Sequence, residues 1–220
     1  MLNFATKRSV SRDRQQMSTV ELSLLALAAF AFFCPAAIPQ TQSKAVAATL
    51  PVTESKRAVE DTASVDFTDW SVNRIKAYKE SLEMDFPSPL AILAVPRLGV
   101  HVSLFEGTDD VTLDRGVGRI AGTAPPGTAG NLGVAGHRDG FFRPLKDIKQ
   151  GDTIKVITPS ALATYNVDRI EIVDPTDIRV LKPGTKTTLT LVTCYPFYFI
   201  GHAPKRFIVE ASLVQFTRIP

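Results

Sequence analysis

The residues of this chain best suited to chemistry are a cysteine, a histidine and an arginine that are far apart in the sequence. Cys194 ends the run Thr-Leu-Val-Thr-Cys, His137 stands in Gly-His-Arg-Asp-Gly, and Arg206 stands in Lys-Arg-Phe. A thiol, an imidazole and a guanidinium supply a nucleophile, a proton carrier and a stabiliser of negative charge. If the fold brings them together, the three groups could carry acyl transfer through a thioester.

The chain has only one cysteine in the part that we expect to be exported. The other, Cys34, lies in an apolar run that enters the membrane or is removed. In an oxidising compartment Cys194 then has no disulfide partner, which indicates a reactive thiol. A free thiol has a pKa of about 8.5 and is only a few per cent thiolate at neutral pH, so a neighbouring cation would activate it. Arg206 stays protonated and suits the oxyanion role.

Strand alternation predicts where the thiol points. Leu189 and Leu191 share one face of their strand with Thr193, whereas Cys194 shares the other face with Val192. If the leucines fill a core, Cys194 faces away from it.

The next apolar stretch places Arg206 on the same outer surface. Phe207 and Val209 share one face of that strand and Arg206 lies on the other. A hairpin through 195–205 would bring Arg206 beside Cys194, although a single bulge would invert this arrangement.

His137 follows a short apolar strand and lies between Gly136 and Gly140. These glycines are expected to let the backbone turn sharply and to leave the imidazole at a strand end. From the residues alone, His202 rivals His137 as the proton carrier because it is closer in sequence to Cys194. His101 lies on the polar face of a strand.

The elements that would position these groups are mostly short strands. The expected strands are rich in Val, Ile, Leu and Thr and cover Ala91–Val95, Val100–Leu104, Leu132–Ala135, Thr153–Ile157, Tyr165–Val173, Thr188–Thr193 and Phe207–Val214. Helical turns are expected over Asp110–Arg115 and Phe141–Ile148. A helix is expected over Phe67–Leu82, capped by Thr68 or Asp69, with an inward arc of Trp70, Ile75, Tyr78 and Leu82. This pattern predicts an antiparallel barrel or sandwich.

The N-terminal part has the organisation of an exported protein. We expect a basic cytoplasmic segment over residues 1–21, a signal-anchor over 22–38, a tether over 39–66 and the folded domain over 67–220. The apolar segment is borderline for a full span, so a cleaved signal peptide and a retained anchor both fit, and we favour retention. Both place the folded domain outside the cytoplasm, on a single-pass membrane protein if the anchor stays.

Charge argues against a nucleic-acid partner. Residues 1–64 hold seven Lys/Arg and five Asp/Glu, which leaves eighteen of the 25 basic and seventeen of the 22 acidic residues for the rest. The folded domain is therefore almost neutral and has no concentrated basic face. No acidic cluster has a metal-ligand spacing, and we predict neither a metal nor a cofactor.

The motifs taken together resemble the sortases, the cysteine transpeptidases that attach proteins to bacterial cell envelopes. The resemblance rests on Gly136-His137-Arg138-Asp139, on the run Thr190–Pro196 and on Lys205-Arg206-Phe207. Further stretches, including Val95–Gly99, Phe105–Thr108 and Gly116–Gly118, are similar to class D sortases in particular. The similarity covers about Phe67 to Phe216.

The resemblance implies an all-β fold, a closed eight-stranded barrel, with the eighth strand near Val117–Ala121 or within Tyr165–Val173. It implies that Cys194 cleaves an LPxTG-like sorting signal after Thr, as a thiol endopeptidase that passes the acyl group to an amine acceptor, such as a cell-wall precursor or a pilin-like protein. It gives the acid–base role to His137 rather than His202, the oxyanion role to Arg206, and a hydrogen-bonding place at the peptide groove to Thr193.

Two other interpretations fit parts of the pattern. L,D-transpeptidases of peptidoglycan also use Cys, His and Arg, but they gather them in one local Ser-His-Gly-Cys-x-Arg cluster, which this chain lacks. A membrane-tethered barrel that binds envelope peptides without catalysis would have no use for an accessible thiol.

Overall fold

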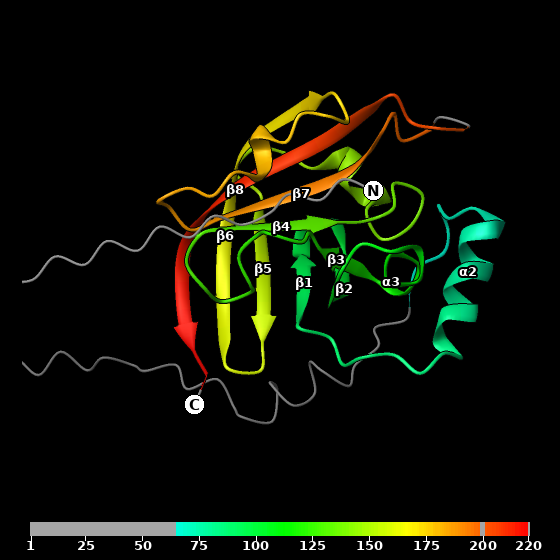
Figure 1. Ribbon diagram of the computed structural model, residues 1–220, viewed down its shortest axis with the longest axis horizontal. Helices are drawn as coiled ribbons and strands as arrows, with labels where there is room; N and C mark the ends of the chain where they lie inside the picture. The colour runs from blue at the N-terminus through cyan, green and yellow to red at the C-terminus, as the bar shows by residue number, and fades with distance from the viewer. Residues whose placement is uncertain (1–64, 199–200, 220) are drawn as a thin grey trace, which may run out of the picture. The chain divides into compact units, whose positions relative to one another are not determined.

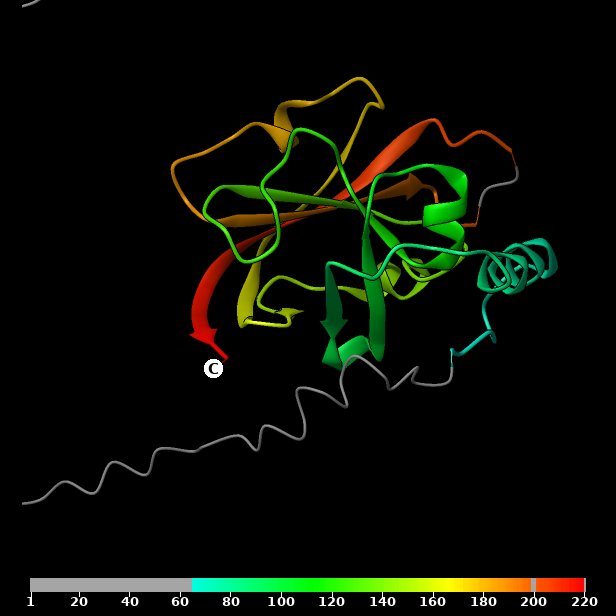
Figure 2. The same ribbon diagram turned by 60° about the horizontal axis from the view of Figure 1, so that its bottom comes forward.

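The structure is a computed structural model that describes residues 65–198 and 201–219. Eight strands close into a barrel in the order β1-β2-β3-β4-β7-β8-β6-β5 (Figure 1, Figure 2). The strands are β1 (Ala91–Val95), β2 (Val100–Glu106), β3 (Val117–Arg119), β4 (Asn131–Ala135), β5 (Thr153–Thr158), β6 (Ala161–Val173), β7 (Thr188–Tyr195) and β8 (Lys205–Arg218). The helices are α2 (Val72–Leu82), α3 (Asp110–Arg115) and the 3-10 helices η1 (Pro96–Leu98), η2 (Arg143–Asp147) and η3 (Arg179–Leu181).

The barrel is mixed, so the expectation of an antiparallel arrangement is wrong. β2 pairs with β3 in parallel, and β4 pairs with β7 in parallel. A parallel neighbour needs a connection that returns the chain to the same end of the sheet. The segment with α3 makes that return between β2 and β3. Between β4 and β7, the returning connection contains the whole β5–β6 hairpin.

The seven expected strands are all present, several of them longer than predicted, and the eighth is β3, at the first of the two places suggested. The expected turn over Phe141–Ile148 is the shorter 3-10 helix η2. The ladder of β7 runs through Cys194 to Tyr195 and stops before Pro196, which cannot donate a ladder hydrogen bond.

Helix α2 begins later than the sequence predicts. Its N-cap is Ser71, whose Oγ accepts a hydrogen bond from the backbone N of Arg74 at 3.2 Å. Thr68 does not cap the helix, because it donates instead to Asp66 in a turn ahead of it. Leu82 was expected to face inward but is 46 % exposed, whereas Tyr78 is buried.

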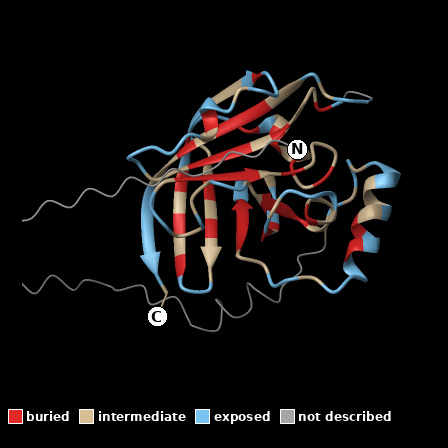
Figure 3. Cartoon of the chain, in the orientation of Figure 1, coloured by how far each residue is buried: buried red, intermediate tan, exposed pale blue. Residues whose placement is uncertain are grey.

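The core lies inside the barrel and is built from alternating positions of the strands (Figure 3). In β7, Leu189 and Leu191 are fully buried in this core. A second, smaller cluster of Val173, Val180 and Ile208 covers part of the outer face, with Val192 packed against it. The two clusters show that inner and outer faces alternate along β7 as predicted.

The structure contains no helix, among residues 65–198 and 201–219, that is long and apolar enough to cross a membrane. The expected basic segment 1–21, the signal-anchor 22–38 and the tether up to residue 64 lie outside the described residues. These assignments stay predictions.

Candidate active site

Cys194 and Arg206 face each other on neighbouring strands. β7 and β8 pair in antiparallel register with Cys194 opposite Arg206 and Tyr195 opposite Lys205, and no bulge interrupts the ladder. Cys194 is a free, partly exposed thiol on the outer face of β7. The predicted hairpin and the predicted parity of both strands are confirmed.

The backbone that carries His137 is joined to the same end of β7. Ala135, the last residue of β4, pairs with Val192, and the next residue, Gly136, donates its N–H to the Val192 carbonyl at 3.2 Å. The Thr193 hydroxyl donates to the Gly136 carbonyl at 2.7 Å across a separation of 57 residues. His137 directly follows Gly136, and Cys194 directly follows Thr193. The sheet therefore sets Cys194 opposite Arg206 and joins the residue before His137 to the residue before Cys194.

The Thr193 side chain lies inside the barrel and forms a hydrogen bond with the backbone. The residue is 2 % exposed, and its hydroxyl bonds to Gly136 rather than facing a surface groove. Its observed contact fixes the strand end that leads into His137. A direct substrate contact by Thr193 stays a prediction.

Gly136 is needed for close packing. The chain turns just after β4, where Gly140 donates its N–H to the His137 carbonyl at 3.2 Å, so His137 follows a strand end as predicted, although neither glycine has a positive φ. A Cβ built on Gly136 would lie 2.6 Å from Cδ2 of Phe142, a fully buried side chain. The Phe142 ring occupies the space that a side chain before His137 would need.

The His137 imidazole sits in an environment that opposes its protonation. Burial lowers the pKa of His137 below its usual value, and the positive charge of Arg74 lowers it further. The carboxylates of Asp114, Asp139 and Asp110 act in the opposite direction. At neutral pH the ring is therefore mostly neutral and can accept a proton.

Arg206 is held by backbone carbonyls. Its Nη1 donates to the carbonyls of Ala203 at 3.3 Å and Lys205 at 3.1 Å. The carboxylates considered as its surface partners are engaged elsewhere: Asp174 pairs with Lys205, and Glu210 pairs with a different arginine. Within the described residues Arg206 thus forms no ion pair, and its planar fork is available to an oxyanion.

Two arginines fasten the β7–β8 connection, and sequence reasoning missed both roles. Arg138 donates to the carbonyls of Pro196 at 3.1 Å and Gly201 at 2.8 Å, and Arg143 donates to the Phe197 carbonyl at 2.6 Å. Their acceptors are backbone oxygens, which leave no pattern in a sequence.

The rival histidine lies on that same connection. His202 is exposed, as is His101 on β2. Neither is joined to β7 by the backbone contacts that lead into His137.

No group of three His, Cys, Asp or Glu side chains that could hold a metal ion is found in the described parts of the chain.

A profile of the sortase domain matches residues 93–214, a span that includes His137, Cys194 and Arg206. The Sortase D of Bacillus subtilis is 31 % identical over 161 residues, which cover 73 % of this chain and 79 % of that protein. This chain belongs to the sortase family. Sortases are cysteine transpeptidases that act on sorting-signal substrates and amine acceptors, and the similarity to class D members that the motifs suggested is confirmed.

Solved sortase structures have the same fold. The Sortase D5 transpeptidase of Clostridium perfringens superposes with a TM-score of 0.55 at 27 % identity, covering 74 % of this chain and 99 % of that one. Sortase E1 of Streptomyces coelicolor, solved with a tripeptide in its active site, superposes with a TM-score of 0.53 at 30 % identity, covering 59 % and 90 %. The predicted barrel and its strand number are therefore those of known sortases.

Proposed function

We propose that this sortase cleaves an LPxTG-like sorting signal after Thr, keeps the acyl part as a thioester on Cys194, and transfers it to an amine of a cell-envelope acceptor. The observation that carries the proposal is the register that sets Cys194 opposite Arg206 while the strand end leading into His137 bonds to Val192 and Thr193.

In the first step the thiol attacks the carbonyl carbon of the threonine residue. The proton of the Cys194 thiol passes to the neutral His137 imidazole, the S–C bond forms, and the carbonyl electron pair moves to oxygen. Arg206, which is free of ion pairs within the described residues, stabilises this oxyanion. The C–N bond then breaks, and the His137 imidazolium returns its proton to the leaving amine.

In the second step an amine replaces the leaving peptide. The neutral imidazole accepts a proton from the incoming amine as its nitrogen attacks the thioester. The tetrahedral intermediate collapses, the C–S bond breaks, and the thiol regains its proton. Water in place of the amine would give hydrolysis by the same route.

The peptide nature of the substrate is supported by a relative. Sortase E1 of Streptomyces coelicolor holds a tripeptide in its active site. We propose a peptide ligand for this chain on that basis. We further propose that residues 22–38 keep the enzyme on the bacterial cytoplasmic membrane with the barrel outside the cytoplasm, as the basic residues ahead of them predict.

The test is turnover of candidate pentapeptide signals by the full chain, with and without an added amine. Cys194→Ala should abolish cleavage and transfer, and Cys34→Ala, the matched control at the other cysteine, should retain both. His137→Gln should lose at least about a hundredfold in kcat/KM, whereas His202→Gln should change little. Peptide binding without turnover by the unmodified chain would instead support the non-catalytic binding barrel.

A further inference from the structure

Two helices outside the barrel place charged groups beside His137, and the proposed chemistry has so far used none of them. Asp114 of α3 lies with Oδ1 3.6 Å from Nε2 of His137. Arg74 of α2 contacts the same Oδ1 through Nη1 and reaches Asp139 Oδ1 through Nε at 3.3 Å. Nε2 of His137 is buried and makes no hydrogen bond within the described residues. One carboxylate oxygen is thus shared between a guanidinium and the imidazole.

We propose that Asp114 is a positioning residue for the His137 imidazole through Nε2, and that Arg74 of α2 holds the Asp114 carboxylate in place. The inference rests on the proposed function, since it assigns a role in proton transfer to groups behind the acid–base residue. It makes α2, which precedes the barrel, a working part of the site.

The distances explain how such a device would operate. At 3.6 Å the neutral ring and Asp114 are outside hydrogen-bond range, and Arg74 occupies the carboxylate. When the ring takes up the thiol proton, a small approach would let Nε2–H donate to Asp114 while Nδ1 exchanges protons with the thiol and the leaving amine. A carboxylate behind a histidine orients the ring and stabilises the imidazolium in other hydrolases.

Several contacts fix α2 against the barrel, so Arg74 is not a free surface arginine. Trp70 and Tyr78 pack edge-on against the ring of Phe141, which follows the His137 motif, at centroid distances of 4.8 and 5.7 Å. The Ser71 hydroxyl donates to Asp139 Oδ2 at 3.3 Å. The side chain of Arg74 is only 19 % exposed.

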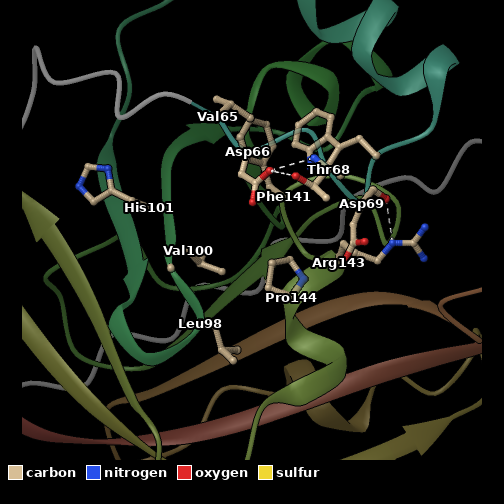
Figure 4. A pocket seen from close by; sticks show the side chains of 13 residues that line it. Val65, Asp66, Thr68, Asp69, Leu98, Val100, His101, Phe141, Arg143 and Pro144 are labelled. Carbon is tan, nitrogen blue, oxygen red and sulfur yellow. Dashed lines mark hydrogen bonds between the residues drawn. The ribbon is translucent and has the colours of Figure 1, made fainter.

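The seam beside this contact contains a groove of about 300 Å³. Its lining comes from the chain that leads into α2, from the segment after β4 and from residues 98–101 (Figure 4). Arg143 donates to the Asp69 carbonyl at 3.2 Å. Lys146 adds an ion pair to Asp69 at 2.8 Å. None of the three predicted catalytic residues lines this groove. It lies where the segment that leads into α2 packs against the barrel.

The proposal predicts opposite effects of the two partners on one observable, the titration of His137 in the full chain followed by NMR. The charged groups that act on the ring are Asp114 and Asp110 on α3, Arg74 on α2, and Asp139 on the β4–β5 connection. Removing a negative charge with Asp114→Asn should lower the pKa of His137 further. Removing the positive charge with Arg74→Gln should raise it.

The chain offers its own control. Lys76→Ala, at an exposed α2 residue that forms an ion pair with Glu80, should leave the titration of His137 unchanged. When a sorting peptide that the enzyme turns over is used as substrate, the acid limb of the pH profile of kcat/KM should shift in the same direction as the His137 titration. Asp114→Asn should lower kcat/KM by about tenfold to a hundredfold.

The inference is overturned if neither charge variant moves the His137 titration, or if both move it in one direction. If Asp114→Asn does not fold, as circular dichroism would show, Arg74→Gln alone must raise the pKa or the inference fails. If the His137 titration shifts as expected but the chain turns over no sorting peptide, the proposed function is contradicted. The pairing of Asp114 with His137 would still stand.

Discussion

The two sides of His137 are built in different ways. On the sheet side, β4, β7 and β8 bring the reactive positions together through backbone ladders and one buried hydroxyl. On the helix side, α2 and α3 place charged side chains beside the ring, with Arg74 between two carboxylates. A ladder fixes position because each residue is held by its neighbours, whereas ion pairs act through charge and set protonation. The comparison indicates that the sheet positions the reactive residues and that the charges on the helices set the pKa of His137.

The largest effect on peptide turnover is expected from replacing Arg206, the charged residue on the sheet side. Arg206→Lys keeps the positive charge but loses the planar fork, so we expect a loss of about a hundredfold or more in peptide turnover. Glu210 and Asp174 have other partners, so the substitution should leave the melting temperature nearly unchanged. Near-normal turnover by this variant would contradict the oxyanion role, and Lys205→Arg, one position away, is the matched control.

The next effect is expected where the sheet side is packed most tightly. Gly136→Ala would force a Cβ against Phe142, and we expect a loss of about 1–3 kcal/mol in the free energy of unfolding, measured with urea. Gly122→Ala also replaces a glycine but meets no atom within 4 Å, although its φ of 80° carries its own smaller cost. Equal effects of the two substitutions would remove the packing explanation.

A comparable loss is expected when the hydroxyl link between β7 and β4 is removed. Thr193→Val keeps the shape but leaves the Gly136 carbonyl without this donor, at a cost of about 1–3 kcal/mol. Thr193→Ser, which keeps the hydroxyl, should retain most of the activity that Thr193→Val loses. Full peptide turnover by Thr193→Val would show that the strand end does not need this bond to hold His137.

How far the sequence predicts the molecule follows the same division. Alternation in β7 and β8 predicts the burial of Leu189 and Leu191 and the outward position of Cys194, because the period of a strand is fixed by its backbone. The parallel pairings were not predicted, because the partner of a strand depends on the path of the connections. Arg74 and Asp114 were not found either, since an ion pair between two helices has no sequence spacing.

A smaller effect is expected on the helix side at the cap of α2. Ser71→Ala removes both the cap to the Arg74 backbone and the bond to Asp139, and should cost about 1 kcal/mol in stability. Ser71→Thr keeps a hydroxyl and serves as the control. If the comparison is right, Ser71→Ala shifts the pH profile of peptide turnover more clearly than it lowers the maximal rate.

The smallest effect is expected in the dependence of stability on pH. The pKa of His137 is lowered in the folded state, while in the unfolded chain it is about 6.5. As the pH falls through that value, His137 binds a proton in the unfolded chain but not in the native protein. The free energy of unfolding therefore decreases until the native ring is protonated as well. Urea unfolding of the parent chain and of His137→Gln at several pH values isolates this component; identical pH slopes would contradict it.

The most direct test of the account is mass spectrometry of the full chain after incubation with a sorting peptide in the absence of an amine and a rapid acid quench. The account predicts that the mass of the peptide's acyl part, ending at Thr, is found on the fragment containing Cys194, that added amine removes it, and that His137→Gln greatly reduces it. Turnover of the peptide with the adduct on another residue, or an adduct of equal yield in His137→Gln, would contradict the convergence of thiol and imidazole at one site.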